Sequence, residues 1–195
     1  TAKSAQEAAR LTESQAFSAI KDLSNDSDIV FITVPDHTLQ KIDGEIAALR
    51  REQCINTEII WYHVSGAHPS GYLSEMKEAG CAVGSMHPLQ SFGEPVSSAS
   101  RLSKAWFTLE GTEKAVGSGK TLLDRTGAKY SLIKAENKPL YHTGACVVSN
   151  FLVTLLESGT CFFEAAGMQR DDVFQAIEPL IDATLANIRE KGTID

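Results

Sequence analysis

Three short polar segments follow apolar runs of the sequence and could line a cleft. Asp36 and His37 come after the first run, Ser65 and Gly66 after the second, and His87 after the third. An imidazole at the end of a strand can donate a hydrogen bond to a carbonyl group or exchange a proton near neutral pH. Proline, glycine, serine and aspartate are also ordinary turn residues. Three such segments in series nevertheless favour a ligand-binding cleft over three unrelated turns.

A second group of polar residues lies at the start of a long helical segment. At about 100° per residue, Lys138, His142 and Ser149 fall within roughly 40° of one another around the helix axis. Tyr141 and Asn150 flank this stripe. Burying unpaired polar groups is costly, so the stripe either lines a wet cleft or makes structural hydrogen bonds to the sheet. We favour the cleft.

The elements that would position these residues alternate along the chain. Short apolar, β-branched runs predict strands at 28–34, 59–64, 81–86, 105–109 and 129–133. Helices are predicted at 3–11, 37–50, 69–79 and 112–126, the last ending at Gly127. Such alternation is typical of an α/β fold with a mainly parallel sheet. The sequence therefore predicts a Rossmann-like domain over residues 1–135, with the three polar segments on one edge of its sheet.

The pattern changes from Pro139 onward. Residues 139–166 carry apolar side chains on nearly every face, which predicts a helix buried on most sides. The final segment has apolar residues at helical spacing and predicts an amphipathic helix, kinked at Pro179. We expect residues 136–195 to form a helical substrate and dimerisation domain, incomplete at its end, through which the protein forms a homodimer.

The bulk composition narrows the classes of partner. The chain has 195 residues and a net charge of −7, which disfavours a nucleic-acid-binding surface. Its four cysteines are widely spaced, no uninterrupted apolar run reaches the ~18–20 residues that span a bilayer, and no signal peptide is evident. We therefore expect a cytoplasmic protein with a small-molecule substrate and no membrane or nucleic-acid partner. The first residue is Thr1, which suggests processing, a fragment or missing residues.

Metal chemistry is a weaker alternative. The histidines at 63, 68, 87 and 142 do not show an HExxH or similar ligand spacing, so we expect no bound metal. His63 is expected to point into the sheet. A metal-assisted hydrolase that uses His87 and His142 would require the two to converge in the fold.

With these segments in view, the chain resembles a family of Rossmann-like NADP-dependent oxidoreductases whose carboxy-terminal region is a domain of unknown function. The resemblance covers most of the chain. Its carriers are Asp28-Ile29-Val30-Phe31-Ile32-Thr33-Val34-Pro35-Asp36, Val64-Ser65-Gly66-Ala67, Gly84-Ser85-Met86-His87-Pro88-Leu89-Gln90-Ser91-Phe92, Lys138-Pro139-Leu140-Tyr141-His142 and Ser149-Asn150. It implies kinship with the wider group that contains 6-phosphogluconate dehydrogenase, pyrroline-5-carboxylate reductase and ketopantoate reductase.

The resemblance also implies a function and a set of site residues. The protein would transfer a hydride between NADP and a small carbonyl, imine or hydroxy compound. The cofactor would pass over Val34, Pro35, Asp36, Ser65 and Gly66. Lys138 and Asn150 would be catalytic by analogy, with His142 and His87 as rival proton donors. The substrate would be lined by Pro88, Gln90, Ser91, Tyr141 and Ser149.

One expected motif is missing. The family should begin with a strand, a Gly-x-Gly-x-x-Gly turn and a helix that hold the pyrophosphate, and the sequence contains no such fingerprint. The glycine-rich unit is therefore expected to be absent from this chain. Two hypotheses remain open: an NADP-dependent oxidoreductase, or a non-catalytic Rossmann-like module that binds and dimerises.

Overall fold

The computed structural model describes residues 2–24, 27–93 and 100–193. The chain forms two compact units, residues 1–143 and 144–195. The first unit contains the sheet and the second contains only helices. The predicted α/β class, a Rossmann-like sheet followed by a helical region, is confirmed.

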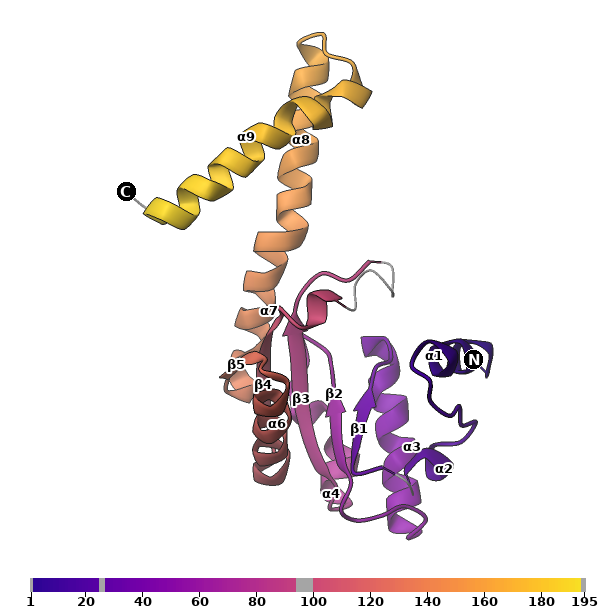
Figure 1. Ribbon diagram of the computed structural model, residues 1–195. Coiled ribbons are helices and arrows are strands. Elements are labelled where there is room, and N and C mark those ends of the chain that lie inside the picture. Colours follow the sequence, from indigo (N-terminus) through magenta and orange to yellow (C-terminus); the bar gives the residue numbers. More distant parts are fainter. Residues whose placement is uncertain (1, 25–26, 94–99, 194–195) are drawn as a thin grey trace. The chain divides into compact units, whose positions relative to one another are not determined.

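A five-stranded sheet forms the centre of the first unit (Figure 1). Its strands, in spatial as well as chain order, are β1 (Ile29–Ile32), β2 (Ile60–His63), β3 (Ala82–Leu89), β4 (Trp106–Gly111) and β5 (Lys129–Leu132). The pairs β1–β2, β2–β3 and β4–β5 are parallel, and β3–β4 is antiparallel. The sheet is thus mainly parallel, as predicted, with one reversal.

β3 is longer than the sequence predicts. We expected the strand to end at Met86, but it continues through His87 and Pro88. The pairing with β2 stops at Ser85, whereas the pairing with β4 continues to Leu89. Pro88 lacks a backbone N–H, and it lies where β3 has lost its β2 neighbour, so the ladder tolerates it. His87 is consequently held inside a strand rather than in a loop after one.

Helices cover both faces of the sheet. α3 and α4 pack on one face and α6 on the other. The helices described in the first unit include α1 (Ala2–Leu11), α2 (Ile20–Ser24), η1 (Asp36–Thr38), α3 (Leu39–Arg51), η2 (Ser70–Tyr72), α4 (Ser74–Glu78), α6 (Glu113–Thr126), η3 (Ala135–Asn137) and α7 (Lys138–Cys146). The Thr112 side chain caps α6 by accepting a hydrogen bond from the Ala115 N–H, and Gly127 ends the helix with φ +69°. The end of α6 at Gly127 was predicted from the sequence. The single helix predicted over 69–79 is wrong: it is two short helices, η2 and α4, separated at Leu73.

The core consists of two apolar clusters, one on each face of the sheet. One cluster joins α3 and α4 to β1–β3 and contains Trp61. The other joins α6 to β2–β4 and contains Tyr62. Successive side chains of a strand point to opposite faces, so these two neighbours on β2 anchor the two clusters. Tyr62 also donates a hydrogen bond of 2.5 Å to the carbonyl of Ala115 in α6.

The second unit consists of helices with little core of their own. A π-helical turn, η4 (Val147–Phe151), leads into α8 (Leu152–Ala165), and α9 (Arg170–Lys191) follows with Pro179 inside it. No residue of α8 is buried. The prediction that residues 139–166 form a buried helix is therefore wrong for the isolated chain, because α9 alone cannot cover a helix that is apolar on every side.

The exposed helix also bears on membrane contact. Among the described residues, one helix, residues 135–165, is long and apolar enough to cross a bilayer by length and composition. Glu157, Ser158 and Gly159 interrupt the apolar run of this helix, so the sequence alone did not predict it. A single helix of this kind is weak evidence for a membrane, because apolar helices of soluble proteins pass the same test.

Candidate functional site

The segments that follow β1 and β2 meet through Ser65. Its hydroxyl donates a hydrogen bond of 2.9 Å to Oδ2 of Asp36. Oγ of Ser65 also accepts hydrogen bonds from the backbone N–H groups of Ala67 and His68, at 3.2 and 3.1 Å. The sequence prediction that Asp36 and Ser65 lie at one edge of the sheet is confirmed. With these bonds made, the Ser65 hydroxyl fixes the turn after β2.

Lys138 reaches this edge from the first turn of α7. It is fully buried, and its ammonium donates hydrogen bonds of 2.8 Å to the Ser65 carbonyl and 2.8 Å to Oγ of Ser85. Burial lowers the pKa of Lys138 to about 8, while the carboxylates of Glu110 and Asp36 oppose this shift. In this arrangement Lys138 ties the ends of β2 and β3 to α7, and its charge is held inside the protein.

His87 and Tyr141 form a hydrogen-bonded pair beside Lys138. Nδ1 of His87 lies 2.7 Å from the Tyr141 hydroxyl, and the two rings meet edge to face, 5.5 Å apart at 81°. Burial lowers the pKa of His87 to about 4, and the nearby charges of Lys138 and His142 add to the effect. Burial also raises the pKa of Tyr141. Near neutral pH the pair is therefore an uncharged imidazole and an intact phenol.

His87 and His142 converge over the backbone of Gly66. A Cβ atom placed on Gly66 would lie 2.8 Å from Nε2 of His87 and 2.9 Å from Nδ1 of His142. Contacts this close exclude any side chain at position 66 unless an imidazole moves. The absence of a side chain at Gly66 lets two imidazoles pack against the turn after β2, and the predicted contact of Gly66 with a cofactor stays a prediction.

A buried network beneath the site was not predicted. The carboxylate of Glu110 in β4 accepts hydrogen bonds from the Ser70 backbone N–H at 2.6 Å and from the Ser70 hydroxyl at 2.7 Å. His63, fully buried as expected, accepts a hydrogen bond of 3.2 Å at Nδ1 from the Ser65 N–H. Burial lowers the pKa of His63 to about 4, with Lys138 as the second cause. The sequence offered one signal for this network, an acidic residue within the apolar run of β4.

Other predicted residues of the first unit lie apart from this cluster. Val34 packs at the edge of the core, and Pro35 precedes η1. Gln90 and Ser91 are exposed, and the Gln90 side chain accepts a hydrogen bond of 2.9 Å from the Ser91 N–H. Pro88 lines an apolar groove. The structure thus joins only part of the predicted set into a single polar cluster.

Ser149 and Asn150 belong to the second unit. Both are exposed and lie in the π-helical turn η4, where the Asn150 amide is 4.0 Å from the sulfur of Cys146. A π turn has more residues per turn than an α-helix, so the 100° spacing behind the predicted stripe does not hold here. The regular stripe from Lys138 to Ser149 is therefore wrong in its geometry, and the catalytic role suggested for Asn150 stays a prediction.

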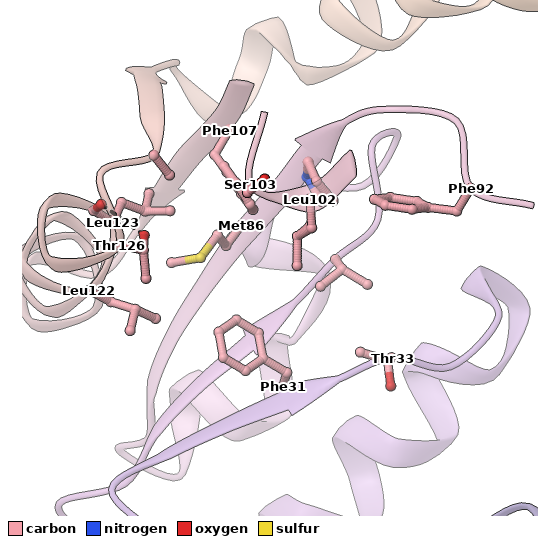
Figure 2. Close-up of a pocket in the computed structure, with 13 residues that line it drawn as sticks. Phe31, Thr33, Met86, Phe92, Leu102, Ser103, Phe107, Leu122, Leu123 and Thr126 are labelled. Atoms are coloured by element: carbon pink, nitrogen blue, oxygen red, sulfur yellow. Dashed lines mark hydrogen bonds between the residues drawn. The ribbon is translucent and has the colours of Figure 1, made fainter. Parts of the chain in front are cut away.

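An apolar groove of about 780 Å³ opens on the α6 face of the sheet (Figure 2). Phe31, Met86 and Phe107 come from the sheet, and Leu122 and Thr126 come from α6. Phe31 is 41% exposed although it stacks on Tyr62. The remaining lining residues are Thr33, Val64, Pro88, Phe92, Leu102, Ser103, Leu123 and Ala128. The groove can accept an apolar body but has few groups for orienting a polar one.

The polar cluster suits polarisation of a neutral group better than metal binding. Within residues 2–24, 27–93 and 100–193, no group of three or more His, Cys, Asp or Glu side chains is placed to hold a metal ion. The sequence contains no glycine-rich turn of the kind that holds a pyrophosphate.

Comparisons with known proteins agree with the two-part organisation. Residues 1–88 match the family model of a Rossmann-like domain, and residues 105–195 match that of a domain of unknown function, DUF2520. Both matches confirm the family resemblance found in the sequence. No curated protein matches the sequence significantly.

Several solved structures share the fold at low sequence identity. A protein from Thermotoga maritima is 23% identical with a TM-score of 0.70, over 97% of this chain and 68% of its own. A proposed NADP oxidoreductase from Bacteroides fragilis is 16% identical with a TM-score of 0.72, over 98% and 70%. A pyrroline carboxylate reductase from Plasmodium falciparum, solved with NADP bound, is 11% identical with a TM-score of 0.66, over 91% and 64%.

Proposed function

We propose that this protein is an NAD(P)-dependent oxidoreductase that acts on a small carbonyl, imine or hydroxy compound. Its Rossmann-like domain is followed by a DUF2520 domain. The observation that carries the proposal is the pair His87–Tyr141, in which His87 packs over Gly66 just beyond the end of β2. In open α/β sheets, ligands bind beyond the carboxyl ends of the parallel strands. The likeness to an NADP-bound reductase supports the cofactor class through the fold.

Charge and burial give the residues of the cluster different proposed roles. His87 is partly exposed and uncharged near neutral pH, so it can donate a hydrogen bond to a substrate oxygen or imine nitrogen without attracting an anion. Lys138 is buried and engaged with Ser65 and Ser85, so its role is to hold the strand ends in place. The nicotinamide cofactor, when bound, supplies or accepts the hydride.

Cofactor contact is proposed for the strand-end residues alone. Pro35, Asp36 and Gly66 would face the nicotinamide end, with Val34 and Ser65 supporting them from behind. The choice between NAD and NADP depends on recognition of the ribose 2′ position, which normally follows the second strand of the complete Rossmann unit. No residue described in this structure is assigned to that task.

Nucleotide binding tests the proposal directly. We would titrate the protein, expressed at the length its gene encodes, with NADPH and NADH and follow the nucleotide fluorescence. Saturable binding of at least one nucleotide at sub-millimolar concentration, reversed by its oxidised form, is the expected result. Absence of saturable binding for both nucleotides would refute the oxidoreductase proposal.

A second candidate function is a non-catalytic module that forms a homodimer. The exposed apolar surface of the second unit favours it: Leu155 is 68% exposed and Phe162 is 77% exposed. Contiguous apolar surface on a soluble protein marks an interaction site. A second copy of the chain could cover the surface of α8 that α9 leaves open.

Sedimentation velocity separates the outcomes for the homodimer. We expect the wild type to sediment as a dimer, and both Leu155→Asp and Phe151→Asp to sediment as folded monomers. Gln40→Asp adds the same charge at an exposed polar position of α3, outside the second unit, and is the control; it should remain dimeric. A monomeric wild type would rule out this interface.

A further inference from the structure

The hydroxyl of Tyr141 is engaged with His87 rather than directed at a ligand. The sequence analysis placed Tyr141 among the substrate-lining residues. In the structure its oxygen is 2.7 Å from Nδ1 of His87, an ordinary hydrogen-bond distance for a hydroxyl group. The ammonium of Lys138 lies 5.8 Å from the centre of the Tyr141 ring, within the range of a cation–π contact. The phenol is thus held from two sides.

The direction of this hydrogen bond follows from the protonation states of the two groups. His87 is uncharged near pH 7 because its pKa is lowered to about 4, and Tyr141 keeps its proton because its pKa is raised. A phenol O–H is a stronger donor than a neutral imidazole N–H, and the unprotonated imidazole nitrogen is a strong acceptor. The favoured arrangement therefore has Tyr141 donating to Nδ1 of His87.

We propose that Tyr141 is a positioning residue that locks His87 in the tautomer protonated at Nε2 and so presents an uncharged N–H donor above Gly66. Which nitrogen of a histidine carries the proton is set by the hydrogen bond that the other nitrogen makes. With Nδ1 committed to Tyr141, the single proton of the imidazole is on Nε2. That nitrogen faces the position where Gly66 lacks a side chain.

This assignment rests on the proposed oxidoreductase function for its purpose, although not for its test. A neutral imidazole N–H can polarise a carbonyl or imine while a hydride is transferred, as a neutral histidine does in other enzymes. An unlocked His87 would divide its population between two tautomers, and only one of them could act as the donor. Tyr141 would therefore contribute to the rate by selecting the competent form.

Lys138 and Nδ1 of His142 are less available for this donor role than Nε2 of His87. The ammonium of Lys138 is buried and already donates to the Ser65 carbonyl and the Ser85 hydroxyl. Nδ1 of His142 packs against Gly66 and is itself buried. The Nε2 edge of His87 is the part of the cluster that has both a defined proton and a partly exposed side chain.

The test is a nuclear magnetic resonance measurement on the full chain labelled with ¹⁵N-histidine. Multiple-bond ¹H–¹⁵N spectra at pH 7 distinguish the two neutral tautomers, and His87→Gln assigns the signals. We expect His87 in the wild type to be protonated at Nε2. In Tyr141→Phe the His87 signals should move toward the average of two tautomers, and the pKa of His87 should rise because the neutral form has lost a hydrogen bond. Tyr72→Phe, which alters the ring stacked on His68, is the matched control and should leave His87 unchanged.

Two results would overturn the proposal: a wild-type His87 protonated at Nδ1, or a tautomer that Tyr141→Phe does not change. The first result needs no variant, so it stands even if Tyr141→Phe fails to fold. Replacing tyrosine by 3-fluorotyrosine, which retains the hydroxyl and makes it a stronger donor, gives a second, milder perturbation; it should shift Nδ1 of His87 in the direction of a stronger hydrogen bond. All of these measurements are made without nucleotide. Failure of NADPH binding would therefore count against the oxidoreductase proposal while leaving the tautomer assignment intact.

Discussion

Lowering the pH from 7 to 5 should destabilise the first unit through His63. This side chain is fully buried at the end of β2, and burial lowers its pKa from 6.5 to about 4. The folded state therefore resists protonation, whereas the unfolded state takes up a proton as the pH falls through 6.5. Stability is present above pH 6.5, is lost progressively between pH 6.5 and 4, and changes no further through this group below pH 4.

The size of the effect follows from the same two pKa values. A shift from 6.5 to about 4 corresponds to about 3 kcal/mol when it is fully expressed. At pH 5, where only part of that window has been crossed, His63 alone should cost about 2 kcal/mol of the free energy of unfolding. His87 has a shift of the same direction and adds a smaller amount, because its side chain is partly exposed and solvent screens its charge.

Urea denaturation followed by circular dichroism at pH 7, 6 and 5 measures this dependence. His63→Asn places an amide oxygen near the position of Nδ1, where it can still accept the Ser65 N–H, and it removes the titrating group. The variant should lose about 2 kcal/mol less than the wild type between pH 7 and 5. His37→Asn, at an exposed position of η1, is the control and should follow the wild type. If His63→Asn and the wild type lose equal stability over this range, the account of His63 as a buried neutral group is refuted.

Two further predictions concern the supports of the site. Glu110→Gln should lower the free energy of unfolding by about 2 kcal/mol, because two hydrogen bonds to a buried carboxylate weaken together. Ser70→Ala removes only one of these bonds and should cost about half as much. Equal losses for the two variants in urea denaturation would contradict this arrangement. Gly66→Ala should cost about 1–3 kcal/mol in the same assay and move the His87 imidazole resonances, because the added methyl group would overlap that ring. Gly71→Ala, where a Cβ would meet no atom within 4 Å, should leave both unchanged, and an unchanged Gly66→Ala would show that the rings are not packed on the glycine.

The sheet was predictable from the sequence because each of its strands is a short apolar run between turn residues. Strand direction was less accessible, since apolar periodicity carries no information on it. The antiparallel pairing of β3 with β4 therefore appeared only in the structure. The continuation of β3 through Pro88 was missed for a related reason: proline argues against a central strand, and only the register shows that β2 has already ended beside Ser85.

The residues that α7 contributes to the candidate site were predicted from the sequence, and their buried partners on the sheet were not. The beginning of α7 was identified because Lys138, Tyr141 and His142 are polar residues in an otherwise apolar segment. Their partners were not identified: Ser85 and Glu110 lie in runs typical of core strands, far away in the sequence. Tertiary hydrogen bonds between distant segments leave no local pattern, and so the buried half of the cluster required the structure.

The distribution of charge in the cluster indicates the kind of ligand group it suits. The ammonium of Lys138 and the carboxylate of Glu110 are both buried; Lys138 donates to Ser65 and Ser85, and Glu110 accepts from Ser70. The partly exposed members of the cluster include His87 and Tyr141, which are uncharged near neutral pH. The exposed charged group beside them is the carboxylate of Asp36, which would repel an anion, so the site offers hydrogen bonds without a net attraction for one. On the proposed function, such a site would orient and polarise an uncharged carbonyl or imine rather than recognise an anion.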